Sequence, residues 1–165
     1  MNFARIWRHI LMNRWSLNRA FPPTVLEAIQ QATARNEKRH RGEIRFVVEA
    51  ELDWGPLLAN LSPRRRAIEV FGGLRVWDTE ENNGVLLYVL LADHDIEIVA
   101  DRGIHRQVGD ETWRRICDAM RAEFKAGRFE QGAVQAIESI SDLLAQHFPP
   151  RGDDQNELSD QPVVI

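Results

Sequence analysis

The chain of 165 residues has almost no cysteine. Cys117 is the only one, so an intrachain disulfide and a zinc cluster built on cysteines are both excluded. The fold must therefore depend on a hydrophobic core, which a chain of this length can supply. The scarcity of cysteine also fits a reducing compartment.

Long hydrophobic runs are missing as well. No apolar stretch approaches the roughly 20 residues that a membrane-spanning helix needs. The N-terminal region is basic, but arginines interrupt it throughout, and it lacks the small-residue cleavage site of a signal peptide. We therefore predict a cytoplasmic protein.

Motifs for common enzyme chemistry are absent from the sequence too. It contains no glycine-rich phosphate loop, no serine-elbow motif and no His-x-x-x-His pair. We accordingly expect no organic cofactor. The formal net charge of −4 argues against general nucleic-acid binding.

The charge is unevenly distributed along the chain. Residues 1–50 carry nine Lys and Arg against four Asp and Glu, whereas residues 51–165 carry 12 against 21. Within residues 1–20, apolar and basic positions alternate with helical spacing, which predicts a short amphipathic helix that packs on the rest of the chain. The alternative is that this helix contacts a protein partner or an anionic membrane surface. The residues that would make such a contact are Arg5, Trp7 and Arg8.

Hydrophobic periodicity divides the rest of the chain into helices and strands. Residues 44–48 alternate in polarity as a strand does, and the nearly continuous apolar run of residues 85–91 suits a strand covered on both faces. Residues 96–100 continue after a turn as its antiparallel neighbour. Helical spacing elsewhere gives the order helix, helix, strand, helix, strand, strand, helix, helix. Few strands among many helices predict a three-layer α/β/α sandwich with a small mixed β-sheet.

These elements suggest three parts of the chain. The amphipathic helix forms an extension over residues 1–20. The sandwich occupies residues 21–148, and residues 149–165 read as a polar, acidic and disordered tail.

The sequence NNGVLLYVLLADHDIEIVADRGI at residues 82–104 is similar to a segment of the TPM domain family. The similarity extends over roughly residues 24–147 and includes, in order, Met120, Phe124, Gly127, Phe129 and Gly132. It implies an α/β/α fold with a sheet of about four strands. It also implies that calcium or another divalent cation can bind, as in some members, and a plant thylakoid relative is described as an acid phosphatase. Where the family usually has a Gly-Tyr-Gly-like turn, this chain has Asp101-Arg102-Gly103.

An acidic corner is predicted at one end of the hairpin. Asp78 and Asn83 precede its first strand and Asp101 ends its second, so the hairpin should bring the three side chains together. Asp110, which begins the next helix, can join them. Gathered carboxylates raise one another's pKa or recruit a cation, and calcium prefers oxygen ligands. The alternative is a purely structural corner, with Asn83 in a turn and Asp110 as a helix cap.

Three functions follow from these features. The first is a binding or regulatory module that holds calcium or another divalent cation at the acidic corner. The second is a metal-dependent acid phosphatase for phosphomonoesters, in which Arg102 binds the anion. The third is a scaffold that reaches a membrane or a protein through its N-terminal helix. No residue is assigned a catalytic role.

Overall fold

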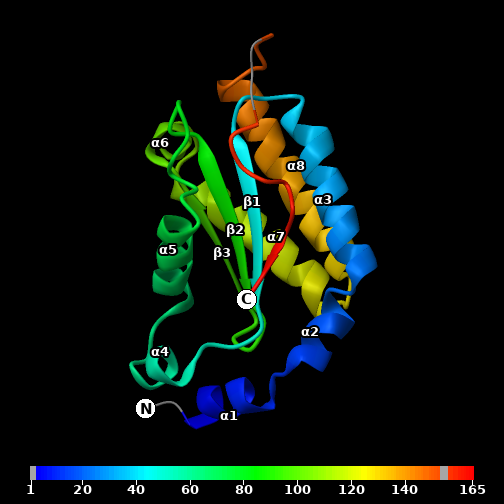
Figure 1. Ribbon diagram of the computed structural model, residues 1–165, viewed down its shortest axis with the longest axis vertical. Helices are drawn as coiled ribbons and strands as arrows, with labels where there is room; N and C mark the ends of the chain where they lie inside the picture. Colours follow the sequence, from blue (N-terminus) through cyan, green and yellow to red (C-terminus); the bar gives the residue numbers. More distant parts are fainter. Residues whose placement is uncertain (1–2, 153–155) are drawn as a thin grey trace.

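The architecture is a four-stranded sheet enclosed by helices (Figure 1). The structure is a computed structural model that describes residues 3–152 and 156–165. The helices are α1 (Phe3–Leu11), α2 (Arg14–Ala20), α3 (Pro23–Glu37), α4 (Trp54–Leu58), α5 (Pro63–Gly73), α6 (Arg102–Val108), α7 (Asp110–Lys125) and α8 (Phe129–His147). The strands are β1 (Glu43–Glu49), β2 (Gly84–Leu90), β3 (Asp95–Ala100) and β4 (Val163–Val164).

The sheet is mixed, with the strand order β3-β2-β1-β4. β1 runs parallel to β2 and to β4, while β2 and β3 form the predicted antiparallel hairpin. Every residue of β2 is buried, as its unbroken apolar sequence predicted. The mixed sheet and its flanking helices confirm the predicted α/β fold.

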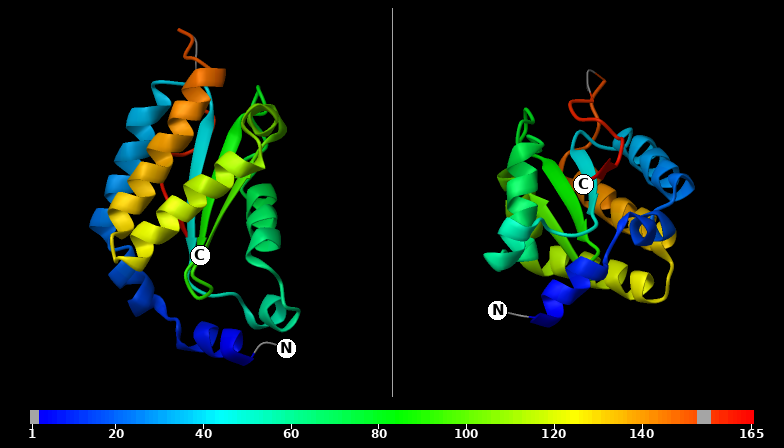
Figure 2. Two further views of the ribbon diagram at one scale, coloured as in Figure 1. Left: turned by 180° about the vertical axis from the view of Figure 1, so that it is seen from behind. Right: turned by 60° about the horizontal axis from the view of Figure 1, so that its bottom comes forward.

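Two hydrophobic cores lie on the two faces of the sheet. Alternate residues of β2 point to opposite faces, so Val85 and Leu87 join one core while Leu86 and Tyr88 join the other. The first core packs under α3, α7 and α8, and the second under α4 and α5. Figure 2 shows the sheet between these two helical layers. The three-layer sandwich therefore follows from the burial of both sheet faces.

The end of the chain departs from the predicted disorder. β4 pairs with β1, and the backbone N–H of Ile165 donates to the carbonyl oxygen of Val48 at 2.9 Å. Without this pairing β1 would present an open edge of unpaired backbone groups. The tail is polar over most of its length, which predicted disorder, but its last three residues are apolar and supply the strand. Residues 153–155, which also fall in the predicted tail, lie outside the described residues.

Carboxyl groups hold the segment before β4 against the sheet. The backbone N–H groups of Glu157 and Leu158 donate to the carboxylate of Glu43 at 2.8 and 3.2 Å. Burial raises the pKa of Glu43 to about 7. Burial, a hydrogen bond with Asp160 and the nearby Glu43 raise the pKa of Glu37 to about 10. The two carboxyl groups respond differently to the tail: the N–H groups of Glu157 and Leu158 favour the ionised form of Glu43, whereas the contact with Asp160 favours the protonated form of Glu37.

Candidate functional site

The acidic corner lies at the end of the hairpin where α6 begins. The register pairs Val85 with Ala100, and the backbone N–H of Asp101 donates to the carbonyl oxygen of Gly84 at 2.8 Å. The hairpin thus brings the start of β2 beside the end of β3, as predicted. Asp101 is 8% exposed and caps α6, because its Oδ1 accepts from the N–H of Arg102 at 2.6 Å.

Two buried oxygen atoms at this corner have no hydrogen-bond donor among the residues that the structure describes. They are Oδ2 of Asp101 and Oδ1 of Asn83. The amide nitrogen of Asn83 does have a partner, since Nδ2 donates to the carbonyl oxygen of Arg41 at 2.9 Å. A buried acceptor without a donor costs about 1–3 kcal/mol. The Asp101 oxygen stands out because it belongs to a group that carries charge when ionised.

The two oxygens do not belong to one cluster. Side chains alternate along a strand, so the register continues Asn83 onto the face of Val85 and Asp101 onto the face of its partner Gly84. Extended by one residue beyond the paired strands, this alternation favours opposite faces for the two side chains. The prediction that the hairpin alone would gather these side chains overlooked this alternation.

The other predicted ligands lie on the surface. Asp78 is exposed in the turn after α5. Asp110 is exposed at the first position of α7, where Nε2 of His105 lies 3.8 Å from its Oδ1. Arg102, the predicted anion-binding residue, is exposed as well. Over residues 3–152 and 156–165, no group of three or more His, Cys, Asp and Glu residues could hold a metal ion. The predicted four-ligand cluster is therefore not formed, and Asp101 is its one buried carboxylate.

Backbone oxygens surround the start of α6. A Cβ atom at Gly103 would lie 2.5 Å from the carbonyl oxygen of Asn82 and 2.7 Å from that of Glu81. Only glycine allows this approach, and the N–H of Gly103 uses it to donate to the Asn82 carbonyl at 2.9 Å. The side chain of Glu81 turns to the guanidinium groups of Arg41 and Arg151 instead. The loop before β2 thus brings the carbonyl oxygen of Glu81 near the start of α6, while the Asn82 carbonyl oxygen and the Glu81 carboxylate already have partners.

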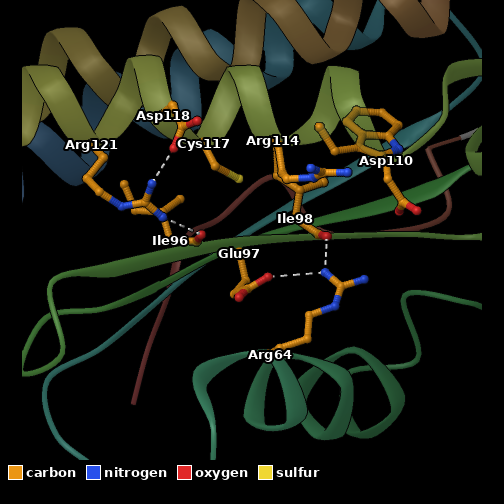
Figure 3. Close-up of a pocket in the computed structure, with 10 residues that line it drawn as sticks. Arg64, Ile96, Glu97, Ile98, Asp110, Arg114, Cys117, Asp118 and Arg121 are labelled. Carbon is orange, nitrogen blue, oxygen red and sulfur yellow. Dashed lines mark hydrogen bonds and ion pairs between the residues drawn. The ribbon is translucent and has the colours of Figure 1, made fainter.

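A polar pocket lies along the free edge of β3, between α5 and α7 (Figure 3). Its volume is about 370 Å³. Arg64 donates to the carbonyl oxygen of Ile98 and to the carboxylate of Glu97, and Arg121 donates to the carbonyl oxygen of Ile96. These guanidinium groups cover backbone oxygens that an open strand edge would leave available for pairing with another chain.

The thiol in this pocket is unsuited to nucleophilic chemistry. Burial raises the pKa of Cys117 to about 12, which keeps it protonated at neutral pH. Its position on the apolar face of α7 identifies it as a core residue. We therefore assign the pocket a structural role in protecting the edge of the sheet.

Comparison with known proteins identifies the family. The model of the TPM domain matches residues 18–143, which is most of the chain. The chain belongs to the TPM domain family. This confirms the resemblance found in the sequence, since the predicted range of roughly residues 24–147 largely coincides with the matched residues 18–143.

The fold of the chain is similar to that of a solved structure. The protein BA42 of the psychrophilic bacterium Bizionia argentinensis, solved by NMR, is 34% identical and superimposes with a TM-score of 0.76. The match covers 86% of this chain and 93% of BA42. None of the curated proteins matches the chain.

The helix α1 precedes the part of the chain that matches the TPM domain. Its buried residues are Arg5 and His9, which lie one turn apart and meet Asp93 in the turn between β2 and β3. Arg5 binds the Asp93 carboxylate through Nε and the NH2 nitrogen, at 2.9 and 2.7 Å, and also donates to the carbonyl oxygen of Leu61. The predicted role of Arg5 in contacting a partner is therefore wrong, because its charge is used inside the protein.

His9 completes this attachment. Its Nδ1 accepts from the backbone N–H of Leu52 at 2.9 Å, which leaves Nε2 to carry the proton 3.3 Å from Oδ1 of Asp93. Burial lowers the pKa of His9. Burial disfavours the Asp93 carboxylate, but hydrogen bonding and the charge of Arg5 outweigh it and lower the pKa of Asp93. The sequence signal for this contact was the i, i+4 spacing of Arg5 and His9 on one helix face.

The two other residues predicted for partner contact remain on the surface. Trp7 is 61% exposed, and the side chain of Arg8 is 47% exposed although it reaches Asp93 at 3.4 Å. Within the described ranges, no helix is long and apolar enough to cross a membrane.

Proposed function

We propose that this TPM domain is a binding module that takes up a divalent cation of the calcium type at Asp101. The observation that carries the proposal is the buried Oδ2 of Asp101, which has no donor among the described residues, whereas Oδ1 accepts from the N–H of Arg102. Calcium binding in some members of the family agrees with it. A cation would replace the missing donor and compensate the buried charge.

The nature of the available ligands sets the expected affinity. Calcium takes six to eight oxygen ligands. One carboxylate, the carbonyl oxygen of Glu81 and water molecules would supply a single negative charge. Sites with a low ligand charge bind calcium at about 0.1–1 mM. We therefore expect a weak affinity for calcium, in the range of extracellular calcium-binding modules and weaker than that of calcium sensors.

A calcium titration monitored by amide NMR shifts tests the proposal. We expect shifts concentrated at residues 81–84 and 100–104, with saturation by about 10 mM calcium. Asp101→Asn keeps an oxygen that can cap α6 and removes the charge, so it should abolish these shifts without unfolding the domain. Asp78→Asn, which changes an exposed carboxylate of the neighbouring turn, is the matched control and should leave the shifts unchanged.

Two results would count against the cation site. Shifts that are absent at about 10 mM calcium would mean that a water molecule or nothing occupies the corner. Shifts that survive in Asp101→Asn and disappear in Asp78→Asn would place the cation on the surface loop. The exposed position of Arg102 gives no support to catalysis on phosphomonoesters, and the proposal therefore does not include phosphatase activity. The cytoplasmic location stays a prediction.

A further inference from the structure

The helix α1 is turned with its apolar side toward solvent. Phe3, Trp7 and Leu11 are 70%, 61% and 70% exposed, while Arg5 and His9 are buried on the opposite side. Positions i, i+4 and i+8 lie on one helix face, so the exposure is a continuous stripe. We call this surface the apolar α1–α2 face; its residues are Phe3, Trp7, Ile10 and Leu11 of α1 and Trp15 of α2.

The orientation of α1 is fixed by the protein itself. Rotating the helix to bury its apolar stripe would expose Arg5 and His9 and break their contacts with Asp93 and with the backbone of Leu61 and Leu52. Those contacts satisfy buried charged groups, which are costly to leave without partners. The large apolar side chains are therefore held in water by polar contacts on the other side, and such a patch marks a docking surface.

The basic residues around the apolar α1–α2 face favour an anionic binding partner. Residues 1–26 contain no Asp or Glu, and Arg14 and Arg19 of α2, next along the chain from α1, are exposed. The guanidinium of Arg19 lies 5.6 Å from the ring centroid of Trp15. Tryptophan beside arginine on an amphipathic helix is typical of the boundary between lipid headgroups and acyl chains. Acidic residues at this end of the molecule include Asp93, whose carboxylate is bound by α1, and the exposed Glu51 and Asp53 on either side of Leu52.

The shape of the molecule allows contact with a flat surface. α1 lies across one end of the sheet, beside α4 and beyond the turn between β2 and β3, in every view of Figures 1 and 2. Its nine residues span about 14 Å, which is too short to cross a bilayer but sufficient to lie in its plane. Asp101 lies at the opposite end of the hairpin, so a bilayer against α1 leaves that end accessible to solvent.

We propose that the apolar α1–α2 face docks in the plane of an anionic lipid bilayer. Phe3, Trp7 and Leu11 enter the boundary of the acyl chains, while Arg14 meets the lipid phosphates; Arg8 stays with Asp93. The contact is independent of the cation site, because the two lie at opposite ends of the sheet. Docking on a bilayer also explains why Arg5 and His9 of α1 face the domain while its large apolar side chains face solvent.

Cosedimentation of the full chain with lipid vesicles tests this docking. We expect binding to vesicles of phosphatidylcholine with phosphatidylserine, much weaker binding to phosphatidylcholine alone, and a decrease as salt is raised. The double substitution Trp7→Ser with Leu11→Ser should reduce binding by about tenfold or more, since it removes two inserted side chains. Arg14→Glu should reduce binding to the anionic vesicles.

The matched control is Trp77→Ser, which removes an exposed tryptophan after α5. It should leave vesicle binding unchanged. Because the substituted side chains face solvent, thermal unfolding of the double variant should match that of the unsubstituted chain. No sedimentation with anionic vesicles, or equal binding by the double variant, would overturn the proposal. A dimer of the unsubstituted chain that the double variant disrupts, with no lipid binding, would overturn it in favour of a second copy as the occupant.

Discussion

The attachment of α1 predicts a large stability loss when Asp93 is changed to asparagine. The side chains of Arg5 and Asp93 are 10% and 6% exposed, so the substitution leaves a buried guanidinium without its counter-charge. Removing one partner of a buried ion pair costs about 3–5 kcal/mol. Arg5 keeps its bond to the carbonyl oxygen of Leu61, so we expect a loss near the lower end, about 3 kcal/mol. If α1 detaches as a unit, the loss is limited to the free energy of its docking.

Urea unfolding monitored by circular dichroism measures this loss, and hydrogen exchange of the α1 amides reports detachment. Asp118→Asn is the control, because Asp118 forms an exposed ion pair with Arg121 that should contribute at most about 0.5 kcal/mol. In a double-mutant cycle with Arg5→Met, the two changes should couple by about 1 kcal/mol or more. The assigned role of the pair would be refuted if Asp93→Asn lost no more unfolding free energy than Asp118→Asn. It would also be refuted if the losses of Asp93→Asn and Arg5→Met were additive.

Two further predictions concern the corner and the tail. Gly103→Ala should destabilise the domain by several kcal/mol, since its Cβ would meet backbone oxygens. Gly72→Ala in α5 has open space around the new Cβ and should stabilise the domain by about 0.5–1 kcal/mol, and thermal unfolding measures both changes. The pKa of Glu37 is raised from 4.5 to about 10 on folding, so its contribution to stability is complete below pH 4.5 and is lost as the pH rises toward 10. The amide of Ile165 should therefore lose protection between pH 6 and 9, and Glu37→Gln should remove much of that dependence; a loss unchanged in Glu37→Gln would assign it to another group.

Much of the fold could be predicted from local patterns. The apolar run of β2 and the alternation of β1 indicated strands because each residue's face is set by the backbone period. The hairpin followed from the turn between two such runs, and the corner at its end was placed correctly. The predicted cluster of ligands is not formed because Asp78 and Asp110 lie exposed in a turn and a helix outside the hairpin, and the pairing of two strands does not fix where those side chains lie.

The sequence by itself determined the long helices α3, α5, α7 and α8, the three longer strands, the burial of the sheet and membership of the TPM domain family, since all of these depend on patterns carried within short segments. Only the tertiary structure decided that Asp93, 88 residues further along, binds Arg5 and turns the apolar side of α1 outward. It likewise decided that β4 closes the edge of β1. A periodic pattern shows that a helix has two unlike faces, but a long-range contact between charged groups determines which face is buried.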